Sequence, residues 1–374
     1  TRAAPGRSTG QTKQPPPSPP DCPIGIGPST PHALMAAGPR LREFQLIEHL
    51  RRRFGRTGPS VVLGIGDDTA IIKPPPGRHL LLTTDLLVED IHFTLSSSTY
   101  EDIGYKAAVA NLSDIAAMGG APHALAVSIA IPRSVNAADV TRLYRGLMAA
   151  CRPYGVSLIG GDTSASRHGL FLSVTLTGYV APKRILRRDG ARIGDIVYVT
   201  GTLGDSLAGL QILKTRPRKG ISRRDIRYLI TRHHRPTPRV QVGQFLVARG
   251  LATAAIDVSD GLSGDLVHLC EQSAVGVHIA ASALPLSRAC RAYAVATKTN
   301  PIQLALRGGE DYELLFTVPA TRRDALERLR RHAGCRLTPI GVIQSKRFGM
   351  TLDIGRGDAT PIRNTSYQHF SANG

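Results

Sequence analysis

SVTLTGYV, residues 173–180, alternates polar and apolar side chains along most of its length. A period of two is typical of an antiparallel strand with one face in the core. The segments around it that we expect to be strands and helices are intermixed, without the strict alternation of a parallel α/β sheet. The sequence therefore predicts an α+β fold.

Further elements follow from apolar periodicity on both sides of this strand. We expect strands at 79–84, 123–131, 156–159, 170–180, 195–200, 253–258 and 311–318. We expect helices near 41–54, 99–118, 137–154, 205–214, 222–231, 237–249, 261–273 and 321–333, with short strands beyond.

Two composition changes suggest the domain boundaries. Residues 1–40 are rich in Pro, Ser and Gly, as in TKQPPPSPPDCP, and we predict a disordered tail there. VAPKRILRRDGARIGD, residues 180–195, is typical of a passage between domains. We therefore expect an N-terminal domain at 41–181 and a C-terminal domain at 182–374.

The formal net charge of +19 raises the question of nucleic-acid binding. Residues 183–239 hold fifteen Lys and Arg against four Asp, and much of this excess lies in 214–239, where basic residues alternate with apolar ones at helical spacing. No helix-turn-helix, zinc-finger or RNA-recognition signature accompanies them. We interpret this segment as a solvated basic helix face, with attraction of anionic substrates as the second interpretation. Nucleic acid is not expected as a partner.

Membrane and redox signals point to the cytoplasm. The longest uncharged apolar run, ALAVSIAIP at 124–132, is far shorter than the ~20 residues of a membrane span. The N-terminal segment carries no secretion-signal pattern. The five cysteines are scattered and lack C-x-x-C spacing, so we expect neither disulfides nor a thiolate zinc site.

Acidic residues gather in loops that follow apolar runs. Asp outnumbers Glu twenty to eight, and LGIGDDTA at 63–70 places Asp67 beside Asp68. Comparable loops are LLTTDLLVEDIHF (81–93), NLSDIAAMGG (111–120), LIGGDTS (158–164), AIDVSDGLSGD (255–265) and GGEDYELLF (308–316). A single Asp in a turn is ordinarily a capping residue, but six such loops are hard to explain as caps. If they converge, their carboxylates repel unless a hard cation such as Mg²⁺ joins them.

A reaction that uses several magnesium ions and few other groups is phosphoryl transfer. The chain lacks G-x-x-x-x-G-K-[ST], G-x-G-x-x-G and the protein-kinase motif set. A nucleotide would then be held mainly through metal bridges. We expect direct transfer, with no residue acting as nucleophile.

Taken together, GIGDD, TTDLLVEDIHF, NLSDIAAMG, LIGGDT, IDVSDGL and GGEDYEL resemble the thiamine-monophosphate kinase family. This family belongs to the superfamily of aminoimidazole ribonucleotide synthetase and selenophosphate synthetase. The resemblance implies two α/β domains: an N-terminal mixed sheet with flanking helices, which pairs in a homodimer, and a C-terminal α/β sandwich. It also implies ATP-dependent, Mg²⁺-assisted phosphorylation of thiamine monophosphate to thiamine diphosphate, with ADP released.

The resemblance assigns roles to individual positions. The implied magnesium ligands are Asp68, Thr83, Thr84, Asp85, Asp114, Asp162, Asp257 and Asp260. The implied nucleotide contacts are Tyr144, Gly161, Asp162, Arg188 and Ser259. The implied thiamine-phosphate contacts are His92, Glu310 and Tyr367. Asp67, next to the implied ligand Asp68, is expected to support the magnesium site without contacting the ion.

Other interpretations remain open at this point. His233 and His234 lack a third metal ligand, so we expect a solvated or capping role for them. Another superfamily member, which activates an amide or selenide with ATP, is the first alternative function. For selenide, the expected reactive Cys near GIGDD is missing. A basic nucleic-acid-binding protein is the alternative from a different class.

Overall fold

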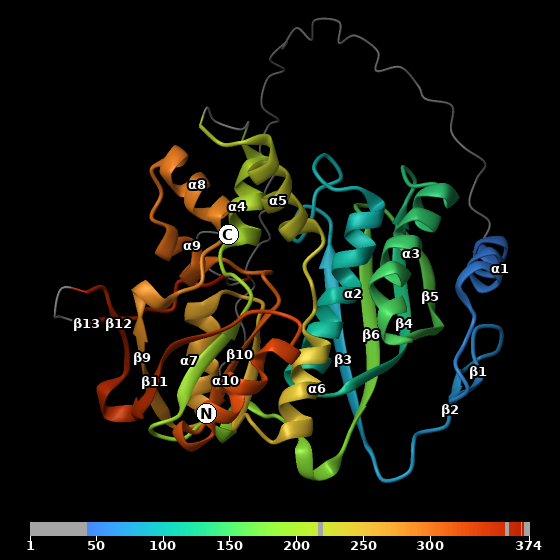
Figure 1. Ribbon diagram of the computed structural model, residues 1–374. Coiled ribbons are helices and arrows are strands. Elements are labelled where there is room, and N and C mark those ends of the chain that lie inside the picture. The colour runs from blue at the N-terminus through green and yellow to red at the C-terminus, as the bar shows by residue number, and fades with distance from the viewer. Residues whose placement is uncertain (1–42, 216–219, 356–358, 368, 370–374) are drawn as a thin grey trace, which may run out of the picture. The chain divides into compact units, whose positions relative to one another are not determined.

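The computed structural model describes residues 43–215, 220–355, 359–367 and 369. The tail predicted at 1–40 lies outside the described residues. The α+β prediction is confirmed, since helices alternate irregularly with two mixed sheets (Figure 1). None of the described helices combines the length and the apolar character needed to cross a membrane.

The first sheet has four strands in the order β3-β6-β4-β5. Its strands are β3 (His79–Val88), β6 (Phe171–Val180), β4 (Ala121–Pro132) and β5 (Ser157–Ser166). The pairs β3–β6 and β6–β4 are antiparallel, and β4–β5 is parallel. A short hairpin of β1 (Val61–Leu63) and β2 (Ile71–Ile72) packs on β4 and β5 through Val61, Ala124 and Ile159. The alternation at 173–180 puts Val174 and Leu176 into the core, as predicted.

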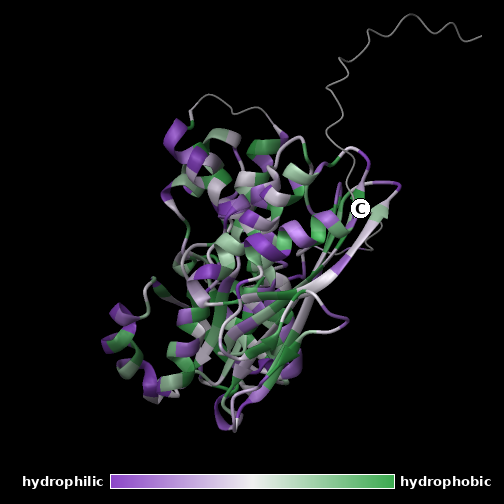
Figure 2. Ribbon diagram, turned by 90° about the vertical axis from the view of Figure 1, so that its right-hand side faces the viewer, coloured by the Kyte–Doolittle hydropathy of each residue, from purple (hydrophilic) through white to green (hydrophobic). Residues whose placement is uncertain are grey.

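The second sheet has seven strands in the order β13-β12-β9-β11-β7-β10-β8. Its strands are β13 (Ala359–Pro361), β12 (Met350–Asp353), β9 (Val275–Ala280), β11 (Leu337–Ser345), β7 (Ile196–Thr200), β10 (Glu313–Val318) and β8 (Ala254–Val258). The β9–β12 pair is parallel, whereas the other pairs are antiparallel. Figure 2 shows that the strands are mostly hydrophobic, whereas the helices carry hydrophilic and hydrophobic residues on different faces.

Ten α-helices lie in the described ranges. They are α1 (Glu43–Phe54), α2 (Tyr100–Ala117), α3 (Ala137–Cys151), α4 (Asp205–Lys214), α5 (Arg223–His234), α6 (Val240–Arg249), α7 (Leu262–Gln272), α8 (Arg288–Thr297), α9 (Pro301–Arg307) and α10 (Arg323–Leu329). The expected helix at 137–154 ends at Cys151 and continues as a 3-10 turn at Arg152–Tyr154. Strand β9 and helices α8 and α9, in 275–307, were not expected.

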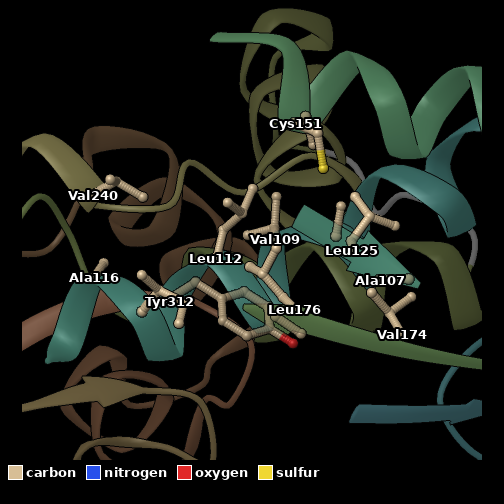
Figure 3. Close-up of a cluster of buried hydrophobic side chains, with 14 of the residues drawn as sticks. Ala107, Val109, Leu112, Ala116, Leu125, Cys151, Val174, Leu176, Val240 and Tyr312 are labelled. Atoms are coloured by element: carbon tan, nitrogen blue, oxygen red, sulfur yellow. The ribbon is translucent and has the colours of Figure 1, made fainter. Parts of the chain in front are cut away.

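Helix α2 is the central element of the fold, because it contacts both sheets. Most of its residues are buried, and a helix that is apolar all round is a buried helix. Figure 3 shows its side chains Ala107, Val109, Leu112 and Ala116 beside Val174 and Leu176 of β6, Val240 of α6 and Tyr312. These residues belong to one core cluster that spans both halves of the described chain.

Glycines let two helices approach α2 closely. A Cβ on Gly146 of α3 would overlap the carbonyl oxygen of Glu101, and one on Gly104 would overlap that of Leu143. On another side of α2, a Cβ on Gly243 of α6 would overlap the carbonyl oxygen of Ala116. The backbone of α2 is therefore held between α3 and α6.

We expect Gly146→Ala to lower the free energy of unfolding by about 1–3 kcal/mol, because the added methyl forces two helix backbones apart. Thermal and urea unfolding would measure the loss. Gly58→Ala is the matched control, since the nearest atom to its new Cβ would be Ser157 Oγ at 3.8 Å. Equal stability of the two variants would contradict this packing.

Candidate active site

The middle and the C-terminal end of α2 organise a polar site between the sheets. At its C-terminal end, Asp114 accepts a hydrogen bond from the Thr83 hydroxyl of β3. The neighbouring Ser113 donates to Asp257 Oδ2 of β8 over 2.8 Å. Consecutive residues of one helix thus connect a strand of the first sheet to a strand of the second, and they bring carboxylates from distant segments together.

The carboxylates of Asp85, Asp114 and Asp257 repel one another. Burial, and then the charge of Asp114, raise the pKa of Asp85 to about 7. Burial and Asp114 likewise raise the pKa of Asp257 to about 7. Asp85 Oδ2 is buried without a hydrogen-bond partner. These three residues, called the carboxylate cluster below, hold more negative charge than the surrounding protein compensates.

Arg188 is the cation that acts on this cluster. Its charge lowers the pKa values of Asp114 and Asp257, although burial outweighs it and keeps both raised. The 3-10 turn Arg188–Gly190 is fixed against β8, because Ala255 N donates to the Arg187 carbonyl over 3.1 Å. Gly190 is required at this approach, since a Cβ there would overlap the Thr253 carbonyl oxygen.

The carboxylate cluster fits Mg²⁺ in its chemistry. Within the described ranges, no three His, Cys, Asp or Glu side chains already form a group that could hold a metal ion by themselves. Mg²⁺ usually takes only one or two carboxylates and completes its shell with water and substrate phosphates. A cation there would pair with Asp85 Oδ2 and relieve the repulsion between the carboxylates.

The loops 259–261 and 308–312 run side by side next to this cluster. Glu310 N donates to the Ser259 carbonyl over 2.7 Å, and Tyr312 N donates to the Val258 carbonyl over 2.9 Å. Gly261 has φ of 122°, a conformation that glycine adopts without strain. Its amide donates to Asp265 Oδ2 over 3.1 Å. Ser259, Asp260 and Glu310 are therefore placed by one pair of turns.

Aromatic side chains from two distant segments of the chain meet near Glu310. The ring centroids of His92 and His369 are 5.0 Å apart, as are those of Tyr367 and His369. Tyr367 N donates to the Asp260 carbonyl over 3.3 Å. His92 Nδ1 accepts a hydrogen bond from Val88 N at 3.0 Å, so in the neutral ring Nε2 carries the hydrogen.

The charges of Glu310 and His369 both act on His92. Burial, followed by the charge of His369, lowers the pKa of His92, while Glu310 acts in the opposite direction. Glu310 in turn accepts a hydrogen bond from Lys106 Nζ at 2.9 Å. Lys106 lies seven residues before Ser113 on α2, so one helix face carries both ends of the site.

Known proteins match the chain over most of its length. Residues 66–180 match the family model "AIR synthase related protein, N-terminal domain", and residues 192–353 match the corresponding C-terminal domain. Thiamine-monophosphate kinase of Haemophilus influenzae is 40% identical over 333 residues, which cover 88% of this chain and 98% of that protein. The chain belongs to the thiamine-monophosphate kinase family.

Solved structures support the same family membership. Thiamine-monophosphate kinase from Stenotrophomonas maltophilia K279a is 38% identical, with a TM-score of 0.75 over 86% of this chain and 98% of that one. A structure described as "AaThiL complexed with AMPPCP and TMP" is 36% identical, with a TM-score of 0.70 over 88% of this chain and 97% of that one. The resemblance expected from the motifs and the two-domain fold class are confirmed.

In this member of the thiamine-monophosphate kinase family, some predicted ligands lie apart from the carboxylate cluster. The cross-strand register places Asp85, Val174, Val127 and Gly161 in one row of the four-stranded sheet. Three strand spacings of about 4.8 Å separate Asp85 from Gly161, or about 14 Å. Asp162 is exposed on β5, at the opposite edge of the sheet from Asp85.

The remaining predicted residues differ in their surroundings. Asp68 is exposed, and its amide donates to Asp67 Oδ1 over 2.8 Å in the loop between β1 and β2. Thr84 is exposed and accepts from Thr175 Oγ1 at 3.2 Å. Tyr144 is only 4% exposed and stacks on Phe54 in the core, so the structure does not place it with the other predicted nucleotide contacts.

The expected solvated or capping role of His233 and His234 is wrong. Their exposures are 4% and 7%, because α5 turns both toward the interior. The basic segment also finds partners within the chain. Arg232 and Arg239 both bind the fully buried Glu313, with Arg239 Nε at 2.6 Å from Oε2. Only part of this segment is therefore a solvated face.

Sequence reasoning missed several residues of the site. They are Lys106, Ser113, His233 and His369. Lys106 had a detectable signal, since it is a single cation in the small and apolar run GYKAAVANL. The pairing of His369 with His92 depends on the path of the C-terminal segment and has no local signal.

Proposed function

We propose that this protein is an ATP-dependent kinase that phosphorylates thiamine monophosphate, giving thiamine diphosphate and ADP. The observation that carries the proposal is the meeting of His92, Glu310 and Tyr367, from three distant segments, beside the carboxylate cluster. An aromatic ring with an amino group suits the first set, and phosphates with divalent cations suit the second. The relative described as bound to AMPPCP and TMP carries the same pair of ligand types.

The reaction needs charge compensation more than a general base. The second pKa of a phosphate monoester is about 6, so the acceptor is mostly ionised at neutral pH. Each pair of like charges at about 4 Å costs about 4 kcal/mol at an effective dielectric constant near 20. Arg188 offsets part of this repulsion. We assign no nucleophile to the protein and expect direct in-line transfer.

We propose Mg²⁺ as the cofactor, held by Asp85, Asp114 and Asp257, with Asp260 adjacent. An ion held there would supply positive charge that compensates the phosphate oxygens. Thr83 orients Asp114, and Ser113 orients Asp257, through the hydrogen bonds described above. Asp114 and Asp257 thus each have one oxygen positioned by the fold, whereas Asp85 Oδ2 has no such partner in the described protein.

We also propose a homodimer that pairs the open face of the four-stranded sheet. Leu80, Leu82 and Leu86 of β3 are 57%, 69% and 54% exposed on this face. Contiguous exposed apolar residues of this kind mark interaction surfaces. Asp162 lies in the same cross-strand row as Leu86, and hence on this face. A second copy related by two-fold symmetry could therefore bring its Asp162 to the β3 edge of the first, where Asp85 lies on the other face of the strand.

The cytoplasm is the compartment that we propose. Cys151, Cys270, Cys290 and Cys335 are all free thiols in the described part of the chain. Disulfides are rare where thiols are kept reduced.

Incubation with Mg²⁺, ATP and thiamine monophosphate tests the activity, with ADP and thiamine diphosphate followed by chromatography. We expect equal amounts of both products, and little turnover of free thiamine, which lacks the anionic acceptor. ADP without thiamine diphosphate, or faster turnover of free thiamine, would contradict the proposal.

We expect Mg²⁺ to stabilise the protein more at pH 8 than at pH 6.5. The pKa values of Asp85 and Asp257, about 7 in the folded chain, lie above the ~3.9 of an unfolded Asp. The folded state therefore binds more protons in between, and the stability of the metal-free protein falls as pH rises. Above pH 7 the carboxylates are ionised and available to Mg²⁺.

Thermal unfolding with Mg²⁺ or with EDTA at both pH values checks this expectation. Asp85→Asn should reduce both the pH dependence without metal and the Mg²⁺-induced rise in Tm. If Mg²⁺ raises Tm equally at both pH values, and equally in Asp85→Asn, the ion binds at a site other than the carboxylate cluster.

A further inference from the structure

Lys106 is a buried cation that the proposed phosphoryl transfer does not use. Its exposure is 4%, in the middle of α2 and next to Ala107. A buried ammonium is costly unless it is paired and hydrogen-bonded. In the described part of the chain its partners are two: Glu310 Oε2 at 2.9 Å and His233 Nε2 at 3.3 Å.

His233 completes this arrangement as a neutral ring. Burial, followed by the charge of Lys106, lowers the pKa of His233 to about 2. An ammonium only donates hydrogen bonds, so Nε2 accepts and the ring hydrogen is on Nδ1. Nδ1 lies 3.1 Å from Ser206 Oγ and 3.4 Å from Glu310 Oε2. Lys106 and His233 therefore approach the same carboxylate oxygen.

The position of His233 is itself fixed by helix packing. It lies near the end of α5, which crosses α4 at Gly209. A Cβ on Gly209 would overlap the Leu229 carbonyl oxygen and would lie 3.0 Å from the His233 Cβ. Lys106 on α2 and His233 on α5 thus come from two rigid elements.

Glu310, in contrast, lies on a loop, so its side chain is held in position by its contacts with Lys106 and His233. Its backbone has φ of 60°, in the left-handed region that is unfavourable for a residue with a Cβ. Its Oε2 faces Lys106 and His233, whereas Oε1 makes no hydrogen bond within the described ranges. The side chain is 28% exposed, so Oε1 is accessible to a ligand.

We propose that Lys106, with His233, is a positioning residue that determines which ring group Glu310 recognises. This inference rests on the proposed function. The Lys106–Glu310 pair has no net charge, so it offers little attraction to a cationic ring. It does present Oε1 as a fixed acceptor for a neutral N–H donor. The exocyclic amino group of the thiamine pyrimidine is such a donor, whereas the thiazolium ring has only its charge.

Lys106→Met tests the proposal by steady-state kinetics with both substrates varied. We expect KM for thiamine monophosphate to rise about tenfold or more, the effect of losing a charge-assisted hydrogen bond. KM for ATP and kcat should change by less than about threefold, because phosphoryl transfer takes place about two turns further along α2, at Asp114. Lys214→Met is the matched control: Lys214 also acts on the pKa of His233, but it is exposed and makes no hydrogen bond or ion pair with Glu310 in the described part of the chain. It should retain both KM values.

A double-mutant cycle with Glu310→Gln separates positioning from general destabilisation. If Lys106 acts through Glu310, adding Lys106→Met to Glu310→Gln raises KM for thiamine monophosphate by less than about threefold further. If the two effects multiply instead, the proposal is wrong. An ATP-induced rise in Tm reports that each variant is folded, and Lys106→Gln replaces Lys106→Met if the latter is not.

A substrate analogue tests the specificity directly. In oxythiamine monophosphate an oxo group replaces the amino group. We expect the wild-type protein to prefer thiamine monophosphate in kcat/KM by about 100-fold or more, because a fixed acceptor would be left unpaired. The preference should shrink at least about tenfold in Lys106→Met. An unchanged preference would overturn the proposal, whereas a wild-type protein that turns over neither substrate would instead contradict the proposed function.

Discussion

Asp85→Asn is expected to lower kcat at least about 10³-fold, which corresponds to about 4 kcal/mol of lost transition-state stabilisation. The substitution removes a negative charge without changing shape. The affected oxygen, Asp85 Oδ2, has no hydrogen-bond partner in the described protein, so no internal contact is lost. The loss would come from weaker binding of the cation that compensates the phosphates.

The same variant should be folded at least as stably as the wild type when metal is absent. Burial and the charge of Asp114 raise the pKa of Asp85, and asparagine relieves that repulsion. Low activity together with an equal or higher Tm would distinguish a metal-ligand role from structural damage. Asp324→Asn, in the exposed first turn of α10, is the matched control and should retain full activity. Near-normal turnover of Asp85→Asn at limiting Mg²⁺ would disprove the assignment.

Mixed dimers are expected to recover activity from two inactive variants. Asp85→Asn and Asp162→Asn should each be inactive as homodimers. If one site combines Asp85 of one subunit with Asp162 of the other, a heterodimer of the two variants contains one intact site. Its activity should then be about half that of the wild type, because one of two equivalent sites remains.

Two affinity tags and sequential purification would isolate the heterodimer for assay. If both residues served the same site within one chain, every site in the heterodimer would carry a substitution and no activity would return. Leu82→Glu provides an independent check, since a charge on the open sheet face should yield monomers by light scattering. A fully active monomer would exclude the shared site.

The elements that could be predicted are those with an apolar pattern in their own short stretch of sequence. The alternation in SVTLTGYV indicated the face of β6, and apolar runs located β3, β4 and β8 near their observed positions. The segment 275–307 was not predicted, because β9 pairs with β11 and β12 from much later in the sequence. Its pairing depends on tertiary contacts and not on a local period.

The site was predictable in its residue types but not in its grouping. Motifs indicated both Asp85 and Asp162 as ligands, yet only the sheet register reveals that three strand spacings separate them. His233 was misjudged because its neighbours in sequence are basic, whereas its neighbours in space are Lys106, Ser206 and Glu310. Burial of a polar side chain is decided by helix packing, which composition does not report.

The close packing of α2 has a consequence for substrate length. Its glycine contacts with α3 and α6 leave its backbone no room to slide, and eight residues separate Lys106 from Asp114. At 1.5 Å per residue, the helix sets about 12 Å between the backbone positions that carry the ring-recognition end and the phosphate end. Analogues with a longer or shorter tether between pyrimidine and phosphate would bind at Glu310 or at the carboxylate cluster, but not at both. The length of the acceptor, as well as its chemical groups, would therefore determine whether it is phosphorylated.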